Sequence, residues 1–267
     1  MDSMNIFNDI ENNVQLLKSN KIKLEQYEET SANGQLDKWI LTKQNGNKYF
    51  WKAPSIIDGV EMYECEAECL ASDLAEIFGI DNFVKYKMVY NVEEFVGYNK
   101  VCESEDFIKD NYFVTYAEIL SDIAYYNGEE KYDKVISVNK SLQEQINNVL
   151  LFDIIIANRD RHLNNSAFIT EKDNGSNIIL FDNGDSFFSK LTDNGLKFAL
   201  NTTFNYSKCR PFFNTVGKQL ELIKFHSLNK VSFNDVSDLT AKYFSGIRLN
   251  TINKWLKISI EKVGLLK

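Results

Sequence analysis

The first hundred residues divide into short apolar runs separated by turn residues, a pattern typical of β-strands. One longer segment, residues 61–78, is predicted to be a helix, and Gly79 follows it. Glycine adopts the left-handed backbone conformation that ends many helices, so we expect the helix to end there. A short amphipathic helix is also expected over residues 4–17. The strands that we expect in this region cover residues 22–29, 39–42, 48–52, 83–90 and 97–102.

From about residue 112 onward, helical patterns dominate, with closing helices expected near residues 213–225, 233–245 and 251–263. Strands with one helix followed by mainly helical sequence predict an α+β fold with two lobes. We expect an N-lobe over residues 1–102, built on an antiparallel sheet with one helix, and a mainly helical C-lobe over residues 103–267. This boundary rests on the change of secondary structure alone.

An apolar run from Val149 to Ile156 predicts a buried helix that ends at Asn158. Ser141 and Glu144 precede the run at the spacing of a capping box, in which two side chains bond the first backbone N–H groups of a helix. Polar residues 158–165 then form a loop. This loop carries the residues with the clearest chemical meaning.

Asp160, Asn165 and Asp182 form a set suited to phosphoryl transfer. Asp173-Asn-Gly175 is a strong turn signal between the apolar strands that we expect at 166–171 and 177–181, and this hairpin brings Asp182 back beside Asn165. Phosphoryl transfer requires a carboxylate that orients a hydroxyl, and carboxylate and amide oxygens that hold Mg²⁺. Each residue alone is an ordinary loop residue. Their order and spacing together favour a catalytic site.

The N-lobe contains candidates for nucleotide binding. Lys52 ends an apolar strand, where a lysine can point towards a nucleotide, and Lys48 and Lys43 are the competing candidates. On the predicted helix, Glu68 is placed to pair with Lys52 and fix its position, and Glu64 is the alternative.

A segment of small residues lies between the first two predicted strands and includes Ser31, Asn33 and Gly34. Small residues let backbone N–H groups approach phosphate oxygens, as in known phosphate loops. The same segment also fits an ordinary hairpin turn, and taken alone it favours that interpretation.

Composition narrows the classes of protein. The chain has 267 residues, of which 44% are hydrophobic and 25% charged, so a packed core is expected. Its net charge of −8 argues against a nucleic-acid groove as the main surface. No apolar run reaches the roughly 18 residues of a membrane span, and the acidic N-terminus does not resemble a signal peptide. We therefore expect a cytoplasmic protein with reduced cysteines, no membrane span and no direct contact with nucleic acid.

The segment Asn158-Arg-Asp160-Arg-His162-Leu-Asn-Asn165 resembles the catalytic loop of HipA-like and CtkA-like serine/threonine kinases. More distantly, it resembles the catalytic loop of phosphoinositide kinases. Asp182-Asn-Gly184 is similar to the metal-binding motif of these kinases. The segment from Glu68 to Ile80 is similar to their helix, and the segment from Ser31 to Lys38 to their phosphate loop. One departure is that Asn165 is followed by Ser-Ala rather than Phe-Gly.

The resemblance implies a two-lobed kinase fold that uses ATP and Mg²⁺ to phosphorylate a Ser or Thr hydroxyl of a protein substrate. Asp160 is then the catalytic carboxylate, and Asn165 and Asp182 are the metal ligands. Lys52 contacts the ATP phosphates and pairs with Glu68. The phosphate loop implied by the same resemblance includes Ser31, Asn33 and Gly34.

Three classes of function stay open from the sequence. The first is an active Ser/Thr protein kinase, such as a toxin kinase with an antitoxin or repressor as partner, or an effector. The second is a kinase of the same fold that acts on a lipid or small molecule. The third is a nucleotide-binding pseudokinase that works as an interaction module. The presence of Lys52, Asp160, Asn165 and Asp182 together weighs against the third class.

Overall fold

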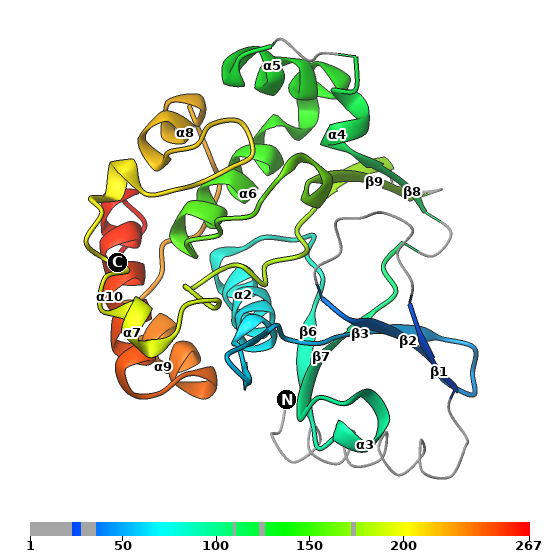
Figure 1. Cartoon of the computed structure of the whole chain (residues 1–267). Coiled ribbons are helices and arrows are strands. Elements are labelled where there is room, and N and C mark those ends of the chain that lie inside the picture. The colour runs from blue at the N-terminus through cyan, green and yellow to red at the C-terminus, as the bar shows by residue number, and fades with distance from the viewer. Residues whose placement is uncertain (1–22, 28–35, 109–110, 123–125, 172–174) are drawn as a thin grey trace.

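A five-stranded antiparallel sheet, with strand order β1-β2-β3-β7-β6, forms the N-terminal part of the chain (Figure 1). The computed structural model describes residues 23–27, 36–108, 111–122, 126–171 and 175–267. The predicted helix over residues 4–17 lies outside these ranges. The strands of the sheet are β1 (Lys23–Gln26), β2 (Lys38–Thr42), β3 (Lys48–Lys52), β6 (Tyr86–Tyr90) and β7 (Lys100–Glu105).

Helix α2 (Glu64–Phe78) lies between this sheet and the helical part of the chain, contacting β6 and β7 on one side and α9 on the other (Figure 1). Most of its side chains are buried, because both sides of the helix are covered. It ends at Gly79, whose φ of 77° is left-handed and whose N–H group bonds the carbonyl oxygens of Ala75 and Glu76. The predicted end of this helix is therefore confirmed.

Replacing Gly79 with Ala is expected to lower the free energy of unfolding by about 1–3 kcal/mol, because a Cβ disfavours this backbone conformation. The new Cβ would also lie 2.6 Å from Nδ2 of Asn229 and displace that side chain. Gly46→Ala is the matched control, since Gly46 has a φ of 82° and open space around it. Urea unfolding of both variants measures the difference. An equal loss in the two variants would show that the Asn229 contact contributes nothing.

The remainder of the chain is mainly helical and is centred on α6 (Gln143–Ile155). This helix is buried on nearly all sides, which explains the continuous apolar run in its sequence. A three-stranded antiparallel sheet, with strand order β10-β9-β8, combines one strand that precedes α6 in the chain with two that follow it. Its strands are β8 (Tyr112–Thr115), β9 (Ala167–Glu171) and β10 (Gly175–Ile179). The helices around α6 are α4 (Tyr116–Ile119), α5 (Gly128–Val138), α7 (Asp193–Leu196), α8 (Val216–Leu222), α9 (Phe233–Tyr243) and α10 (Gly246–Lys262).

Short elements complete the described residues. They are the hairpin of β4 (Ile56–Ile57) and β5 (Val60–Glu61), the helix α3 (Glu93–Val96), and the 3-10 turns η1 (Lys140–Leu142), η2 (Leu163–Asn165) and η3 (Phe204–Tyr206). Helix α3 was not expected from the sequence. None of the helices in the described part of the chain has the length and apolar character that a membrane crossing requires. All four cysteines are buried free thiols.

The capping box predicted at Ser141 and Glu144 is wrong. The side chain of Asn139 instead accepts bonds from the backbone N–H and the hydroxyl of Ser141, and it caps the short turn η1. Helix α6 continues directly from that turn, so its first residues need no cap of their own. The helix ends at Ile155 rather than Asn158, because Ala157 has a φ of 55° and leaves the helical conformation.

The antiparallel sheet with a helical C-terminal part confirms the predicted α+β class with two unlike parts (Figure 1). The division at residue 102 stays a prediction. Strand β7 continues to Glu105, so the N-terminal sheet itself extends beyond that residue.

Candidate active site

Lys52 is the last residue of β3, an inner strand of the sheet between β2 and β7. Its ammonium group lies 2.5 Å from Oε1 of Glu68 on α2, and it also contacts Oδ1 of Asp182. The side chain of Lys52 is only 13% exposed. One cation therefore joins the sheet, helix α2 and the segment that follows β10.

The competing candidates named from the sequence lie elsewhere. Lys48 is exposed, and the ammonium group of Lys43 lies 3.9 Å from the centre of the Tyr49 ring. Glu64 accepts a bond from the hydroxyl of Ser55. Of the alternatives considered, the structure brings Lys52 and Glu68 together.

The charges at this centre support one another. Burial alone would lower the pKa of Lys52, but the carboxylates of Asp182 and Glu68 outweigh it and raise that pKa well above its ordinary value. Burial would raise the pKa of Asp182, but the charge of Lys52 outweighs it, and the pKa of Asp182 falls. Lys52 is therefore an ammonium and Asp182 a carboxylate at neutral pH.

Glu68 is fully buried, and it uses both carboxylate oxygens. Oε1 contacts Lys52, and Oε2 accepts the backbone N–H of Asn183 at 2.7 Å. Burial raises the pKa of Glu68, while the charge of Lys52 and the N–H of Asn183 oppose that rise. Glu68 thereby holds Lys52 and also fixes the backbone next to Asp182.

The position of Asp182 is set from the other side by the N-terminal part of the chain. The carbonyl oxygen of Leu180 accepts the N–H of Val84 at 2.9 Å, and the N–H of Leu180 donates to the carbonyl of Asn82 at 3.0 Å. The side chain of Asp182 keeps 35% exposure, so it can still reach a ligand.

Arg161 ties the predicted catalytic loop, residues 158–165, to this segment, and it is not among the site residues predicted from the sequence. Its guanidinium bonds both carboxylate oxygens of Asp153 on α6, at 2.9 and 3.0 Å. The same group donates to the carbonyl of Asn165 at 2.7 Å, to the carbonyl of Phe181, and to Oδ1 of Asn183 at 2.5 Å. Arg161 is only 1% exposed, so it acts from within the protein as a positioning residue.

The loop presents Asp160 to solvent from a fixed backbone. Asn158 is buried, its amide group donates to Asp153, and its Oδ1 accepts the backbone N–H of Asp160 at 3.1 Å. The side chain of Asp160 is 42% exposed and lies 3.8 Å from the guanidinium of Arg210. A carboxylate held in this way is accessible to a hydroxyl group from solution.

Asn165 is oriented in a way that fits a metal ligand. Its Nδ2 donates to the carbonyl of Asp160 at 3.3 Å, which leaves Oδ1 available. His162 supports the same loop, since its Nδ1 accepts the N–H of Asn164. The described residues contain no group of three or more His, Cys, Asp or Glu side chains that could hold a metal by themselves. Mg²⁺ in phosphoryl-transfer enzymes requires only one or two protein oxygens besides phosphate.

Strained backbone flanks the site. Ala157, Asp182, Phe187 and Phe188 have φ values between 52° and 59°, which residues other than glycine rarely adopt. Each such residue costs about 1–3 kcal/mol and persists only where the surrounding structure holds it. Asp182 lies between Phe181 and Asn183, which both accept bonds from Arg161. The phosphate-loop residues Ser31, Asn33 and Gly34 lie outside the described part of the chain.

A signal for the Arg161 centre is present in the sequence. Asp153 interrupts an otherwise apolar run, and a carboxylate on a buried helix requires a buried cation. The two arginines of the nearby loop are the natural candidates for that cation. Which of them turns inward depends on tertiary packing and cannot be read from spacing alone.

No model of a known protein family matches the sequence, and a search of curated proteins gives no match. Among solved structures, the Golgi casein kinase is similar over 98% of this chain and 75% of that chain, with a TM-score of 0.52 and 12% identity. A Fam20 protein of hydra, solved with sugar, covers 93% of this chain and 88% of its own, with a TM-score of 0.47 and 14% identity. The first likeness shows that this chain has a kinase-like fold.

Proposed function

We propose that this chain is a phosphotransferase that moves the γ-phosphoryl group of ATP to a Ser or Thr hydroxyl of a protein. One observation carries the proposal. Lys52 is held between Glu68 and Asp182, and Arg161 connects the neighbours of Asp182 to the loop that bears Asp160 and Asn165. A kinase-like fold supports the same reaction class.

In this proposal Lys52 binds the phosphate oxygens of ATP, and Glu68 keeps its ammonium group in place. Asp182, as a carboxylate, and Oδ1 of Asn165 hold Mg²⁺. When bound, Mg²⁺ neutralises charge on the phosphates. Lys52 and Asp182 already contact each other, so both groups are in position before the nucleotide binds. On binding, Lys52 would exchange this contact for the phosphate, and Asp182 would exchange it for the metal.

Asp160 orients the acceptor hydroxyl and accepts its proton. Its partial exposure and its fixed backbone suit that role, since the acceptor arrives from solution. The preference for a protein over a lipid or a small molecule comes from the resemblance to HipA-like and CtkA-like kinases. The same resemblance supports an antitoxin or repressor as a partner.

ATP is expected to bind tightly only in the presence of Mg²⁺, because without the metal the phosphates and the carboxylate of Asp182 repel each other and compete for Lys52. Replacing Asp182 with Asn is expected to weaken Mg-ATP binding by at least about tenfold, as losing even a supporting residue of a metal site does. Isothermal titration calorimetry with Mg²⁺, and with EDTA in its place, measures both effects.

Asp133→Asn is the matched control for this experiment, since Asp133 is an exposed residue of α5 away from the site. It is expected to bind Mg-ATP like the wild type. Equal affinity of the wild type in Mg²⁺ and in EDTA would count against Asp182 and Asn165 as metal ligands.

A further inference from the structure

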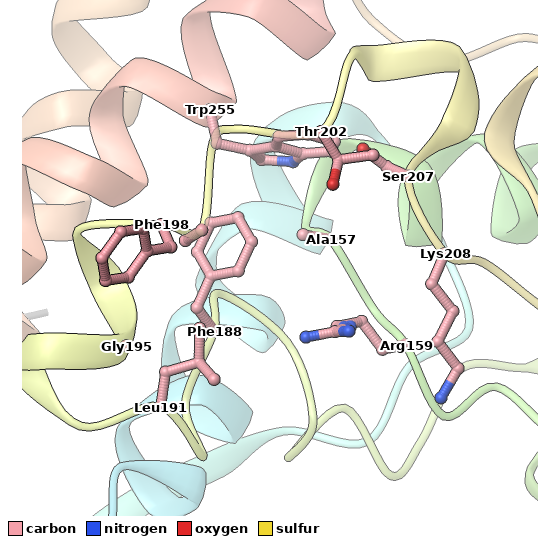
Figure 2. Close-up of a pocket in the computed structure, with 11 residues that line it drawn as sticks. Ala157, Arg159, Phe188, Leu191, Gly195, Phe198, Thr202, Ser207, Lys208 and Trp255 are labelled. Atoms are coloured by element: carbon pink, nitrogen blue, oxygen red, sulfur yellow. The ribbon is translucent and has the colours of Figure 1, made fainter.

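A pocket of about 220 Å³ opens beside the catalytic loop. Its lining includes three aromatic rings, Phe188, Phe198 and Trp255, and two cations, Arg159 and Lys208. Figure 2 shows the rings gathered on one side of the pocket and the two cations on the other. The pocket therefore combines an apolar wall with a positively charged edge.

Two of the three rings in the apolar wall are held in place by the surrounding protein, and the third lies at the surface. Trp255 donates from its indole nitrogen to the carbonyl of Ile155 at 2.9 Å, and its ring meets that of Phe188 edge-on. Both rings are buried, whereas Phe198 is 68% exposed. The exposed ring of Phe198 therefore extends the apolar wall to the surface, where another molecule can contact it.

The charged edge is only partly compensated within the described residues. Arg159 and Lys208 make no ion pair there, although both oppose the rise that burial causes in the pKa of Asp185. Lys190 and Arg210 pair with Asp185 and Asp160, so four cations lie near two carboxylates. The chain as a whole carries a net charge of −8, so this positive edge is a local exception. Such a local field attracts an anionic group.

The size and position of the pocket limit its occupant. Pockets for drug-sized ligands have volumes of roughly 300–1,000 Å³, so this pocket suits a single side chain. Arg159 directly precedes Asp160, and Lys208 lies two residues before Arg210, which contacts Asp160. The occupant therefore lies next to the place where the acceptor hydroxyl arrives.

We propose that this pocket binds the polypeptide that accepts the phosphoryl group. One large apolar side chain of the acceptor enters between the three rings, and an acidic residue beside it pairs with Arg159 and Lys208. The inference rests on the proposed transfer at Asp160 and adds the chemistry of the acceptor, which is an acidic segment with an apolar residue close to the phosphorylated hydroxyl.

Fluorescence anisotropy with labelled peptides tests the proposal without ATP. The first peptide carries Leu between acidic residues, the second carries Leu between lysines, and the third is the acidic peptide with Leu replaced by Ser. The wild type is expected to bind the first peptide at least tenfold more tightly than either of the others. Arg159→Glu combined with Lys208→Glu is expected to reverse the preference towards the lysine peptide.

Two further variants separate the parts of the pocket. Phe198→Ser removes an exposed ring without changing charge, and it is expected to weaken binding of the acidic Leu peptide but not of the acidic Ser peptide. Lys134→Glu combined with Lys230→Glu makes the same change of net charge at exposed positions outside the pocket lining. It is expected to keep the preference of the wild type.

Equal binding of the acidic and basic Leu peptides by the wild type would overturn the proposal. A loss in the Lys134/Lys230 variant as large as in the Arg159/Lys208 variant would do the same, because it would show a general charge effect. Binding to phosphatidylserine vesicles through Arg159 and Lys208, without any peptide preference, would assign the pocket to a lipid instead. Since no nucleotide is present, failure of these tests is distinct from failure of Mg-ATP binding.

Discussion

Replacing Asp160 with Asn is expected to lower the rate of phosphoryl transfer by about 100- to 10,000-fold, the usual contribution of a positioned acid or base. Asparagine keeps the size of the side chain but cannot accept the proton of the acceptor hydroxyl. The role is expressed in the transition state, so Mg-ATP binding is expected to change little. The fold is also expected to persist, because the carboxylate is 42% exposed and its ion pair with Arg210 spans 3.8 Å.

The measurement is a single-turnover rate with saturating Mg-ATP, together with calorimetry of nucleotide binding. Asp133→Asn again serves as the control for the loss of one exposed carboxylate. If Asp160→Asn kept most of the wild-type rate, Asp160 would not be the catalytic carboxylate. If it lost nucleotide binding as well, its role would be structural.

Replacing Arg161 with Met is expected to lower the free energy of unfolding by about 3–5 kcal/mol, the usual cost of breaking a buried ion pair by removing one partner. The variant leaves Asp153 buried without a cation, and both side chains are only 1% exposed in the wild type. It also removes the donors that hold the carbonyls of Asn165 and Phe181. Chemical denaturation measures the loss of stability.

The double variant Asp153→Leu with Arg161→Met separates the effect of losing the ion pair from the effect of losing side-chain volume. It removes the stranded carboxylate, so it is expected to recover much of the loss in stability. Activity is not expected to recover, because the bonds that join the catalytic loop to Asn183 stay absent. Lys85→Met is the control, since Lys85 and Glu76 form an exposed pair worth at most about 1 kcal/mol. If Arg161→Met lost no more free energy of unfolding than Lys85→Met, the proposed cost of breaking the buried Asp153–Arg161 pair would be wrong.

The pH dependence of the Arg161→Met variant gives a second readout. Burial raises the pKa of Asp153, and Arg161 opposes that rise. Without Arg161 the pKa of the native carboxyl rises further, so the native state binds a proton that the unfolded state has lost. The free energy of unfolding of the variant, relative to that of the wild type, is therefore expected to fall as pH rises. It is expected to recover as pH is lowered towards about 3.9, the ordinary pKa of aspartate.

Local signals were sufficient to predict most of the elements. The left-handed cap at Gly79 and the strand that ends at Lys52 follow from turn chemistry and short-range patterns. The capping box at Ser141 failed because Asn139, two residues earlier, offers a better acceptor and starts a 3-10 turn instead. Helix α3 is a single turn, and a segment that short has no periodicity that would reveal it.

The sequence predicts which residues share a site, but it does not predict what holds them together. Lys52, Glu68 and Asp182 lie far apart in the chain, and the structure places them in contact. The guanidinium of Arg161 and the carboxylate of Glu68 join several segments at once, by bonds to backbone groups that no side-chain pattern encodes. The charged pocket at Arg159 and Lys208 arises only when the catalytic loop and residues 207–208 meet.

The most direct test of the proposed function is transfer of labelled γ-phosphate from ATP to a panel of protein, lipid and sugar acceptors. Label is expected on Ser or Thr of protein, and its incorporation is expected to require Mg²⁺ and to be lost in Asp160→Asn. Transfer to lipid or sugar alone would keep the reaction class but contradict the protein acceptor. Transfer at the same rate in EDTA would contradict the proposed phosphotransferase function. Failure of the protein to bind Mg-ATP would contradict it as well.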